Sequence, residues 1–168
     1  TEDVLPTIKS FLDKSVEFFK RDTSETLRSK NIAGTLARIA EQYDPKSLGV
    51  TALCYLPSPF VSLGSLEEAV HTLVFNDADS SMGVEEIKDP VFCRTSFGLR
   101  AVNPARGLRS DHDYVYREAN IALATKNKNF ASGSLVGPSP INFIVSQGES
   151  FFIDSETKLK IAHILDGV

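Results

Sequence analysis

The side chains with the clearest chemical potential lie on a predicted strand that covers residues 114–125. Alternate residues of a strand face opposite ways, so Tyr114, Tyr116 and Glu118 share one face with His112. Aromatic surface, hydroxyls, a carboxylate and an imidazole in one row are typical of a ligand pocket. We therefore expect Tyr114, Tyr116 and Glu118 to bind a ligand. A solvated face with ordinary cross-strand pairs is the alternative.

Charge is unevenly distributed along the chain. Residues 94–117 hold five arginines and two aspartates, whereas residues 65–89 hold seven acids and one lysine. Arg94 and Arg100 share a face of their predicted strand, and guanidinium groups suit carboxylates and phosphates. We expect these two arginines to meet an anionic group of the ligand. Pairing between the basic and acidic segments, within one chain or between subunits, is the alternative.

Arg117 breaks the pattern of the strand, because it points with Val115, Ala119 and Ile121 toward the predicted core. A buried charge needs a partner, and the candidates are Glu68, Glu85 and Asp166.

Acid–base chemistry has three candidates, Glu118, His163 and His112. His163 shares a face with apolar residues of the last predicted strand, which predicts that it is half-buried. A hydrogen-bonded core histidine and a general base in a pocket are both open.

Metal and cofactor motifs are weak. Asp77, Asp79 and Ser81 match the first positions of a calcium loop, but its glycine is one position late and Lys88 replaces the final glutamate. No glycine-rich nucleotide motif occurs, so we expect neither metal nor cofactor. Cys54 and Cys93 lie in apolar runs and are predicted to be buried free thiols, which gives a weak preference for the cytoplasm or another reducing compartment.

Length and composition predict one domain over residues 1–168, with residues 1–21 as a separable or oligomerising helix. The net charge of −4 argues against a nucleic-acid partner. No apolar run is long enough to predict a membrane-spanning segment.

Hydrophobic periodicity predicts two N-terminal helices, a strand, a short helix and then a series of strands. The predicted helices cover 4–20, 22–44 and 66–74, the predicted strands cover 48–56, 91–101, 114–125, 141–147, 150–154 and 159–165, and 76–90 is predicted to be a loop. Helices segregated from strands predict an α+β fold. The expected architecture is two N-terminal helices on a curved, mainly antiparallel sheet of five or six strands, cone-like or sensor-like.

This element order resembles the cone-shaped folds of the nuclear-transport-factor-2 type, across the whole chain and without a shared motif. The leading functional hypothesis is a ligand-binding or protein-interaction domain with a pocket on the concave sheet face, and its partner is a small anionic molecule. The second is a cofactor-free lyase or isomerase acting on a small, anionic substrate in the same cavity. The third is a structural module, in which Phe11, Phe18 and Phe19 of the first helix contact a protein partner or form a homodimer.

Overall fold

A computed structural model of the chain describes residues 16–19, 21, 32–102 and 115–165. Its elements, in chain order, are α2 (Ala33–Tyr43), β1 (Val50–Cys54), α3 (Leu63–Phe75), β2 (Ser80–Ile87), β3 (Phe92–Thr95), β4 (Gly98–Ala101), β5 (Val115–Lys126), the 3-10 helix η4 (Asn127–Ser132), β6 (Pro140–Ile144) and α4 (Glu156–Leu165).

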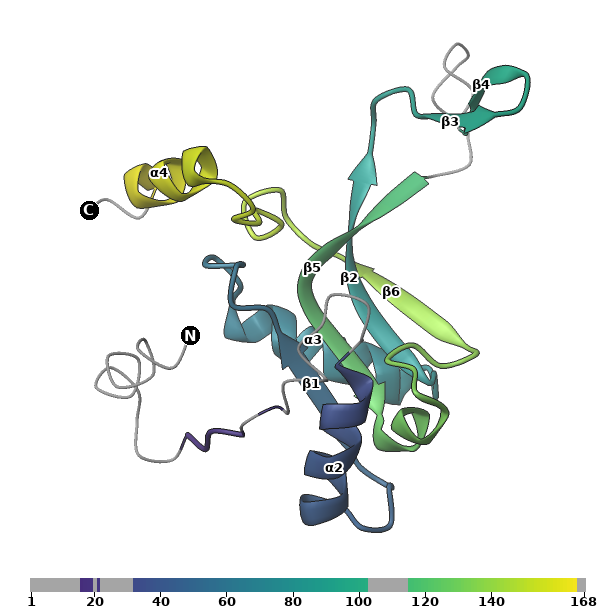
Figure 1. Cartoon of the computed structure of the whole chain (residues 1–168), viewed down its shortest axis with the longest axis vertical. Coiled ribbons are helices and arrows are strands. Elements are labelled where there is room, and N and C mark those ends of the chain that lie inside the picture. Colours follow the sequence, from purple (N-terminus) through teal and green to yellow (C-terminus); the bar gives the residue numbers. More distant parts are fainter. Residues whose placement is uncertain (1–15, 20, 22–31, 103–114, 166–168) are drawn as a thin grey trace.

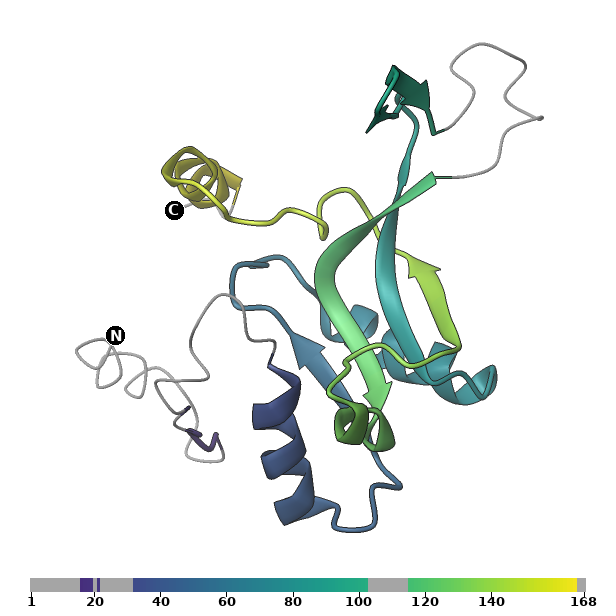
Figure 2. The same ribbon diagram turned by 45° about the vertical axis from the view of Figure 1, so that its right-hand side comes forward.

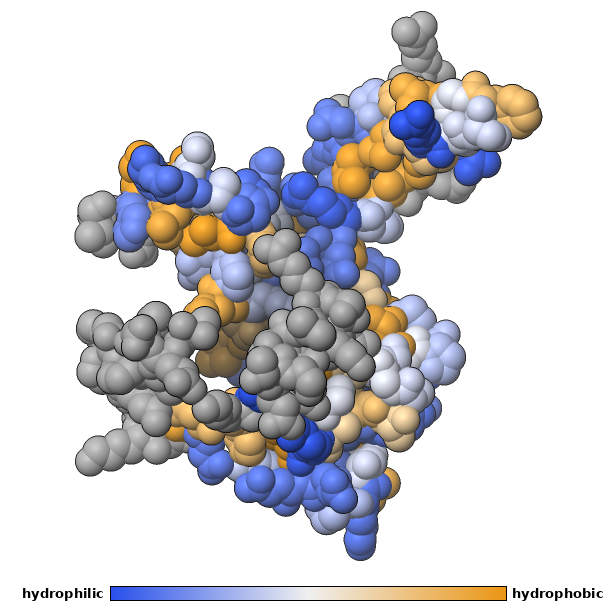
Figure 3. All heavy atoms as spheres, viewed as in Figure 1, coloured by the Kyte–Doolittle hydropathy of each residue, from blue (hydrophilic) through white to orange (hydrophobic). Residues whose placement is uncertain are grey.

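The main sheet is mixed, with four strands in the order β1-β5-β2-β6. β5 is antiparallel to both of its neighbours, and β6 is parallel to β2. As a result, β1, β2 and β6 all point in the same direction. β3 and β4 form a separate hairpin that stands away from this sheet (Figures 1 and 2). Figure 3 shows hydrophobic surface on that hairpin.

Two apolar clusters form the core. In the first, α3 packs on β5 and β6, with Leu73 and Ile121 fully buried and Val50 packed against them. In the second, α2 meets η4 through Leu36 and Phe130, with Leu53 against them. Val50 and Leu53 are an odd number of residues apart on β1, so the two clusters lie on opposite faces of the sheet. The fold therefore has three layers, with the sheet in the middle.

Local signals explain the two helices that flank β1. α2 ends at Asp44 because the residue before Pro45 is pushed out of the helical region. The Asp44 Oδ2 atom then accepts hydrogen bonds from the Gly49 N–H at 2.7 Å and from Asn127 Nδ2 at 2.8 Å. α3 begins after Ser62, whose hydroxyl accepts the Ser65 N–H at 3.1 Å as an N-cap.

The predicted fold class is wrong. The main sheet in the described part of the chain has four strands, is mixed, and carries helices on both faces. The resemblance to the cone-shaped folds of the nuclear-transport-factor-2 type is therefore also wrong. The predicted loop 76–90 contains β2, the predicted strand 159–165 is part of α4, and 150–154 pairs with no described strand. Most of the first predicted helix lies outside the described residues, and residues 16–19 are not helical.

The two cysteines are free, but Cys54 is exposed and Cys93 is half-buried, so the prediction that they are buried is wrong. Among the helices that the structure describes, none has the length and hydropathy to span a membrane.

Candidate functional site

The carboxyl ends of β1, β2 and β6 meet at one edge of the sheet, because these three strands point the same way. In open sheets of this kind, ligands bind in crevices outside the carboxyl ends of the strands. Two adjoining pockets lie at this edge. The β2-side pocket has a volume of about 540 Å³, and the β5-side pocket has a volume of about 380 Å³.

A sharp irregularity in β5 shapes the β5-side pocket. Asn120 has a left-handed backbone with φ of 53°, and the pairing of β5 with β2 shifts register there, between Met82 and Val84. The Ser58 hydroxyl, itself buried, donates to the Asn120 carbonyl at 2.8 Å. This bond holds the segment after β1 against the irregularity. Residues 117 and 118 are consequently exposed, while Ala119 and Ile121 stay in the core.

The β5-side pocket combines charged, amide, hydroxyl and aromatic groups. Its lining comes from β2, β5, the segment after β6 and the first residues of α4: Glu85, Arg117, Glu118, Ala119, Asn120, Gln147, Ser150, Phe151, Phe152, Asp154 and Lys158. Donors and acceptors thus border a hollow of a size that suits a small molecule.

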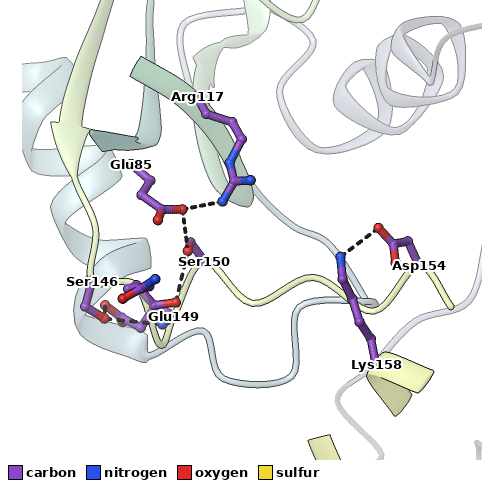
Figure 4. Close-up of polar contacts among 8 residues, drawn as sticks. Glu85, Arg117, Ser146, Glu149, Ser150, Asp154 and Lys158 are labelled. Atoms are coloured by element: carbon purple, nitrogen blue, oxygen red, sulfur yellow. Dashed lines mark hydrogen bonds and ion pairs between the residues drawn. The ribbon is translucent and has the colours of Figure 1, made fainter. Parts of the chain in front are cut away.

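An ion pair between neighbouring strands stands at the wall of this pocket (Figure 4). Arg117 Nη2 lies 2.5 Å from Glu85 Oε2, and the two residues are directly opposite in the β2–β5 register. The Ser150 hydroxyl donates to the same oxygen at 2.8 Å. Burial raises the pKa of Glu85, but the hydrogen bonds from Arg117 and Ser150 outweigh it and leave this pKa below its ordinary value.

A second cation lies at the opposite side of the pocket. Lys158 Nζ, on α4, is 2.8 Å from Oδ2 of Asp154, which lies just before that helix. The hydrogen bond from Lys158 lowers the pKa of Asp154. Tyr55, which follows β1, is half-buried, and both burial and the charge of Glu118 raise the pKa of its hydroxyl.

Next to the pocket, Glu149 ties the turn after β6 to the N-terminus of α3. Its carboxylate accepts hydrogen bonds from the hydroxyls of Ser65 at 2.6 Å, Ser62 at 2.7 Å and Ser146 at 3.0 Å. The bonds from Ser65 and Ser62 are the main cause of a lowered pKa at Glu149. This carboxylate holds residues 146–150, and therefore part of the pocket wall, in place.

The structure disperses the residues that the sequence predicted for a site. Glu118 borders the β5-side pocket, and Tyr116 is exposed opposite Glu86. Arg94 and Arg100 lie on the separate hairpin, on facing strands rather than on one strand face. His163 is exposed on α4, not half-buried on a strand. His112 and Tyr114 lie outside the described residues.

Arg117 has Glu85 as its partner, one of the three candidates, but its side chain is 63% exposed and therefore not buried. Four residues of the pocket lining were not predicted from the sequence: Gln147, Ser150, Asp154 and Lys158. In the sequence these residues mark only a polar turn and the start of a helix. The fold is what brings both segments next to β5.

No group of three or more His, Cys, Asp or Glu side chains within the described ranges is arranged to hold a metal ion. The acidic residues of the imperfect calcium loop pair instead with lysines, Asp77 with Lys126 and Asp79 with Lys128.

Comparison with known proteins gives a fold and no family. No family model matches the chain, and no curated protein matches it. The solved structure of 4-diphosphocytidyl-2C-methyl-D-erythritol synthase from Anaerococcus prevotii is similar, with a TM-score of 0.71 and 14% identity, over 99% of this chain and 77% of that one. The 2-C-methyl-D-erythritol 4-phosphate cytidylyltransferase from Thermus thermophilus gives a TM-score of 0.49 and 15% identity, over 94% and 80%. The first likeness shows that the chain shares the fold of that synthase.

Proposed function

We propose that this domain binds a small, hydroxyl-bearing anionic molecule in the β5-side pocket. The observation that carries the proposal is the position of Arg117 and Lys158, two cations that border one hollow at the carboxyl edge of the sheet. Guanidinium and ammonium groups are the usual protein partners of carboxylates and phosphates.

The remaining lining fits the rest of such a ligand. Glu118 and Asp154 offer carboxylate oxygens to ligand hydroxyls, and the Gln147 amide can donate and accept. Phe151 and Phe152 add apolar surface for a carbon skeleton or a flat ring. The named product of the similar synthase carries a diphosphate and a polyol, and a ligand with phosphate and hydroxyl groups suits this lining too.

The test is thermal unfolding of the protein with inorganic phosphate, pyrophosphate, cytidine diphosphate and a sugar acid. A ligand that binds only the folded state stabilises it by about 2.7 kcal/mol at 100 times its Kd. We expect at least one compound to raise the Tm of the wild-type protein by several degrees.

Arg117→Ala and Lys158→Ala should each reduce that increase. Lys160→Ala is the matched control, because Lys160 forms a similar helical ion pair, with Glu156, outside the pocket. A flat response to the whole panel, or equal responses of the Arg117 variant and the wild type, would contradict the proposal.

A second function, self-association, is favoured by the hairpin β3–β4. Phe97 is fully exposed and Leu99 is 75% exposed, and the exposed Phe92 lies on the same face of the hairpin as Leu99. Arg94 lies opposite Leu99 on that face and Arg100 is exposed on the other face of the hairpin, while α3 presents Glu67 and Glu68 at its surface. Because these charges are complementary, a second copy of this chain is the occupant that we propose for the hairpin.

A further inference from the structure

The Glu85–Arg117 pair separates the two pockets at the carboxyl edge. Glu85, Arg117 and Gln147 border both the β2-side pocket and the β5-side pocket. The Glu85–Arg117 ion pair and Gln147 thus belong to the wall between the two pockets. A rearrangement of the Arg117 side chain alone would change both pockets at once.

The two partners of this pair are held very differently. Glu85 is only 19% exposed, and the Ser150 hydroxyl, itself buried, donates to its Oε2 atom. Arg117 is 63% exposed and contacts that same oxygen through Nη2. Exposed ion pairs are weak because water screens them. Glu85 is therefore the anchored partner, and Arg117 is the one that can move at little cost.

The contact with Glu85 also uses few of the N–H donors of the Arg117 guanidinium. Arginine binds carboxylates and phosphates best through two parallel N–H···O bonds. The contact with Glu85 instead joins one nitrogen, Arg117 Nη2, to one oxygen, Glu85 Oε2. An anion that enters either pocket can offer Arg117 a two-oxygen partner, which Glu85 does not.

We propose that Glu85 is an internal counter-ion, which the anionic group of the ligand displaces from Arg117. This inference rests on the proposed function. It makes Glu85 a specificity-determining residue, because an anion must compete with an ionised carboxylate and also lie near its negative charge. Ligands with two or more oxygens and high charge, such as phosphates, overcome this competition, and single-oxygen or weakly charged acceptors do not.

Isothermal titration with inorganic phosphate and pyrophosphate tests this idea directly. Glu85→Gln keeps the shape of the side chain and removes its charge, so phosphate should bind roughly two- to five-fold more tightly than to the wild type, the size of one lost charge pair at a partly exposed site. Glu41→Gln makes the same change of net charge on the surface of α2, away from both pockets, and should leave affinity unchanged. The gain should also vanish in the double variant Glu85→Gln/Arg117→Ala.

The outcomes separate the two proposals. If phosphate and pyrophosphate bind neither the wild type nor Glu85→Gln, the pocket is not an anion site, and both proposals fall. If Arg117→Ala loses binding but Glu85→Gln binds as the wild type or more weakly, the site stands and the role of Glu85 as a competitor is overturned.

A second measurement covers the case in which Glu85→Gln does not fold. In the wild-type protein, the Arg117 Nε–H resonance should shift when phosphate is added, because the guanidinium changes partner. Binding of phosphate without any change of that resonance would overturn the inference.

Discussion

At the scale of single residues, Asn120 is the most informative position, because its backbone has φ of 53° in the middle of β5. Asparagine tolerates the left-handed region, glycine enters it freely, and a β-branched residue is strained there. We expect Asn120→Val to lower the free energy of unfolding by about 1–2 kcal/mol. Asn120→Gly should change it by less than about 0.5 kcal/mol. Urea denaturation measures both, and a Val variant as stable as the wild type would show that the irregularity is not needed.

Glu149 should make the stability of the protein depend on pH. Hydrogen bonds from Ser65 and Ser62 lower its pKa in the folded state below the ordinary value of 4.5. Its contribution is therefore complete above pH 4.5 and is lost as the pH falls toward the folded pKa. Glu149→Gln should cost about 1–2 kcal/mol at neutral pH.

The measurement is denaturant unfolding of both proteins at several pH values. The difference between the wild type and Glu149→Gln should shrink on the acid side of 4.5. Glu41→Gln, on the surface of α2, is the control for the loss of one negative charge. A difference that stays constant from neutral to acidic pH would contradict this role of the carboxylate.

The pairing of Arg117 with Glu85 shows what sequence can predict about a single residue. The alternation of β5 singled out Arg117 as a charge without a partner, and Glu85 was among the three acids named. The expectation that Arg117 is buried is wrong because the irregularity at Asn120 shifts the register of β5. A left-handed asparagine within a strand has no reliable signal in the sequence.

At the scale of elements, Gly83 tests how tightly β2 is packed. A Cβ atom at this position would lie 3.0 Å from Val145 Cγ1 and 3.3 Å from Ile121 Cγ1. Gly83→Ala should therefore destabilise the protein by about 1–3 kcal/mol through overpacking.

Gly64 is the matched control for Gly83, because it lies in the first turn of α3, where a Cβ atom would meet only the Ser62 Oγ atom, at 3.6 Å. Gly64→Ala should leave stability unchanged or raise it by up to about 1 kcal/mol, since alanine favours the helix. Both values follow from urea denaturation. Equal effects of the two substitutions would mean that the close approach at Gly83 carries no cost.

Elements with a strong period were predicted well, and those whose pattern is ambiguous were not. Five elements overlap segments whose helical or strand structure was predicted correctly: α2, α3, β1, β5 and β6. β2 was missed because it begins with Ser80 and Ser81, two polar residues that are fully buried, and carries two acids, Glu85 and Glu86, just before its last residue. The residues of α4 were predicted as a strand, because "LKIAHIL" satisfies a period of two and a helical period alike.

At the scale of the whole molecule, the order of strands decides where the site lies, and it could not be predicted. β2 lies between β5 and β6 although it comes before both in the chain, and its pairing with β6 is parallel. Such long-range pairing has no local signature. Only this order brings Glu85, Arg117 and Ser150 together, from three segments that are distant in the sequence.

The exposed hairpin β3–β4 predicts that two copies of the chain associate. A two-stranded ribbon with exposed apolar residues is marginally stable by itself in water, and packing against another surface would stabilise it. We expect the protein to form a dimer whose population rises with concentration, as measured by light scattering or sedimentation equilibrium. The double variant Phe97→Ser/Leu99→Ser should shift the mass to that of a monomer, because it removes the two most exposed apolar side chains of the hairpin.

Leu56→Ser is the control for that assembly experiment, since Leu56 is as exposed but lies in the loop after β1, away from the hairpin. This variant should keep the mass of the wild type. Added salt should weaken the dimer as well, because Arg94 and Arg100 would face acidic residues of the second copy and salt screens exposed charges. A wild-type protein that stays monomeric at high concentration, or a hairpin variant with unchanged mass, would exclude the hairpin as the contact and leave its apolar surface for a different partner.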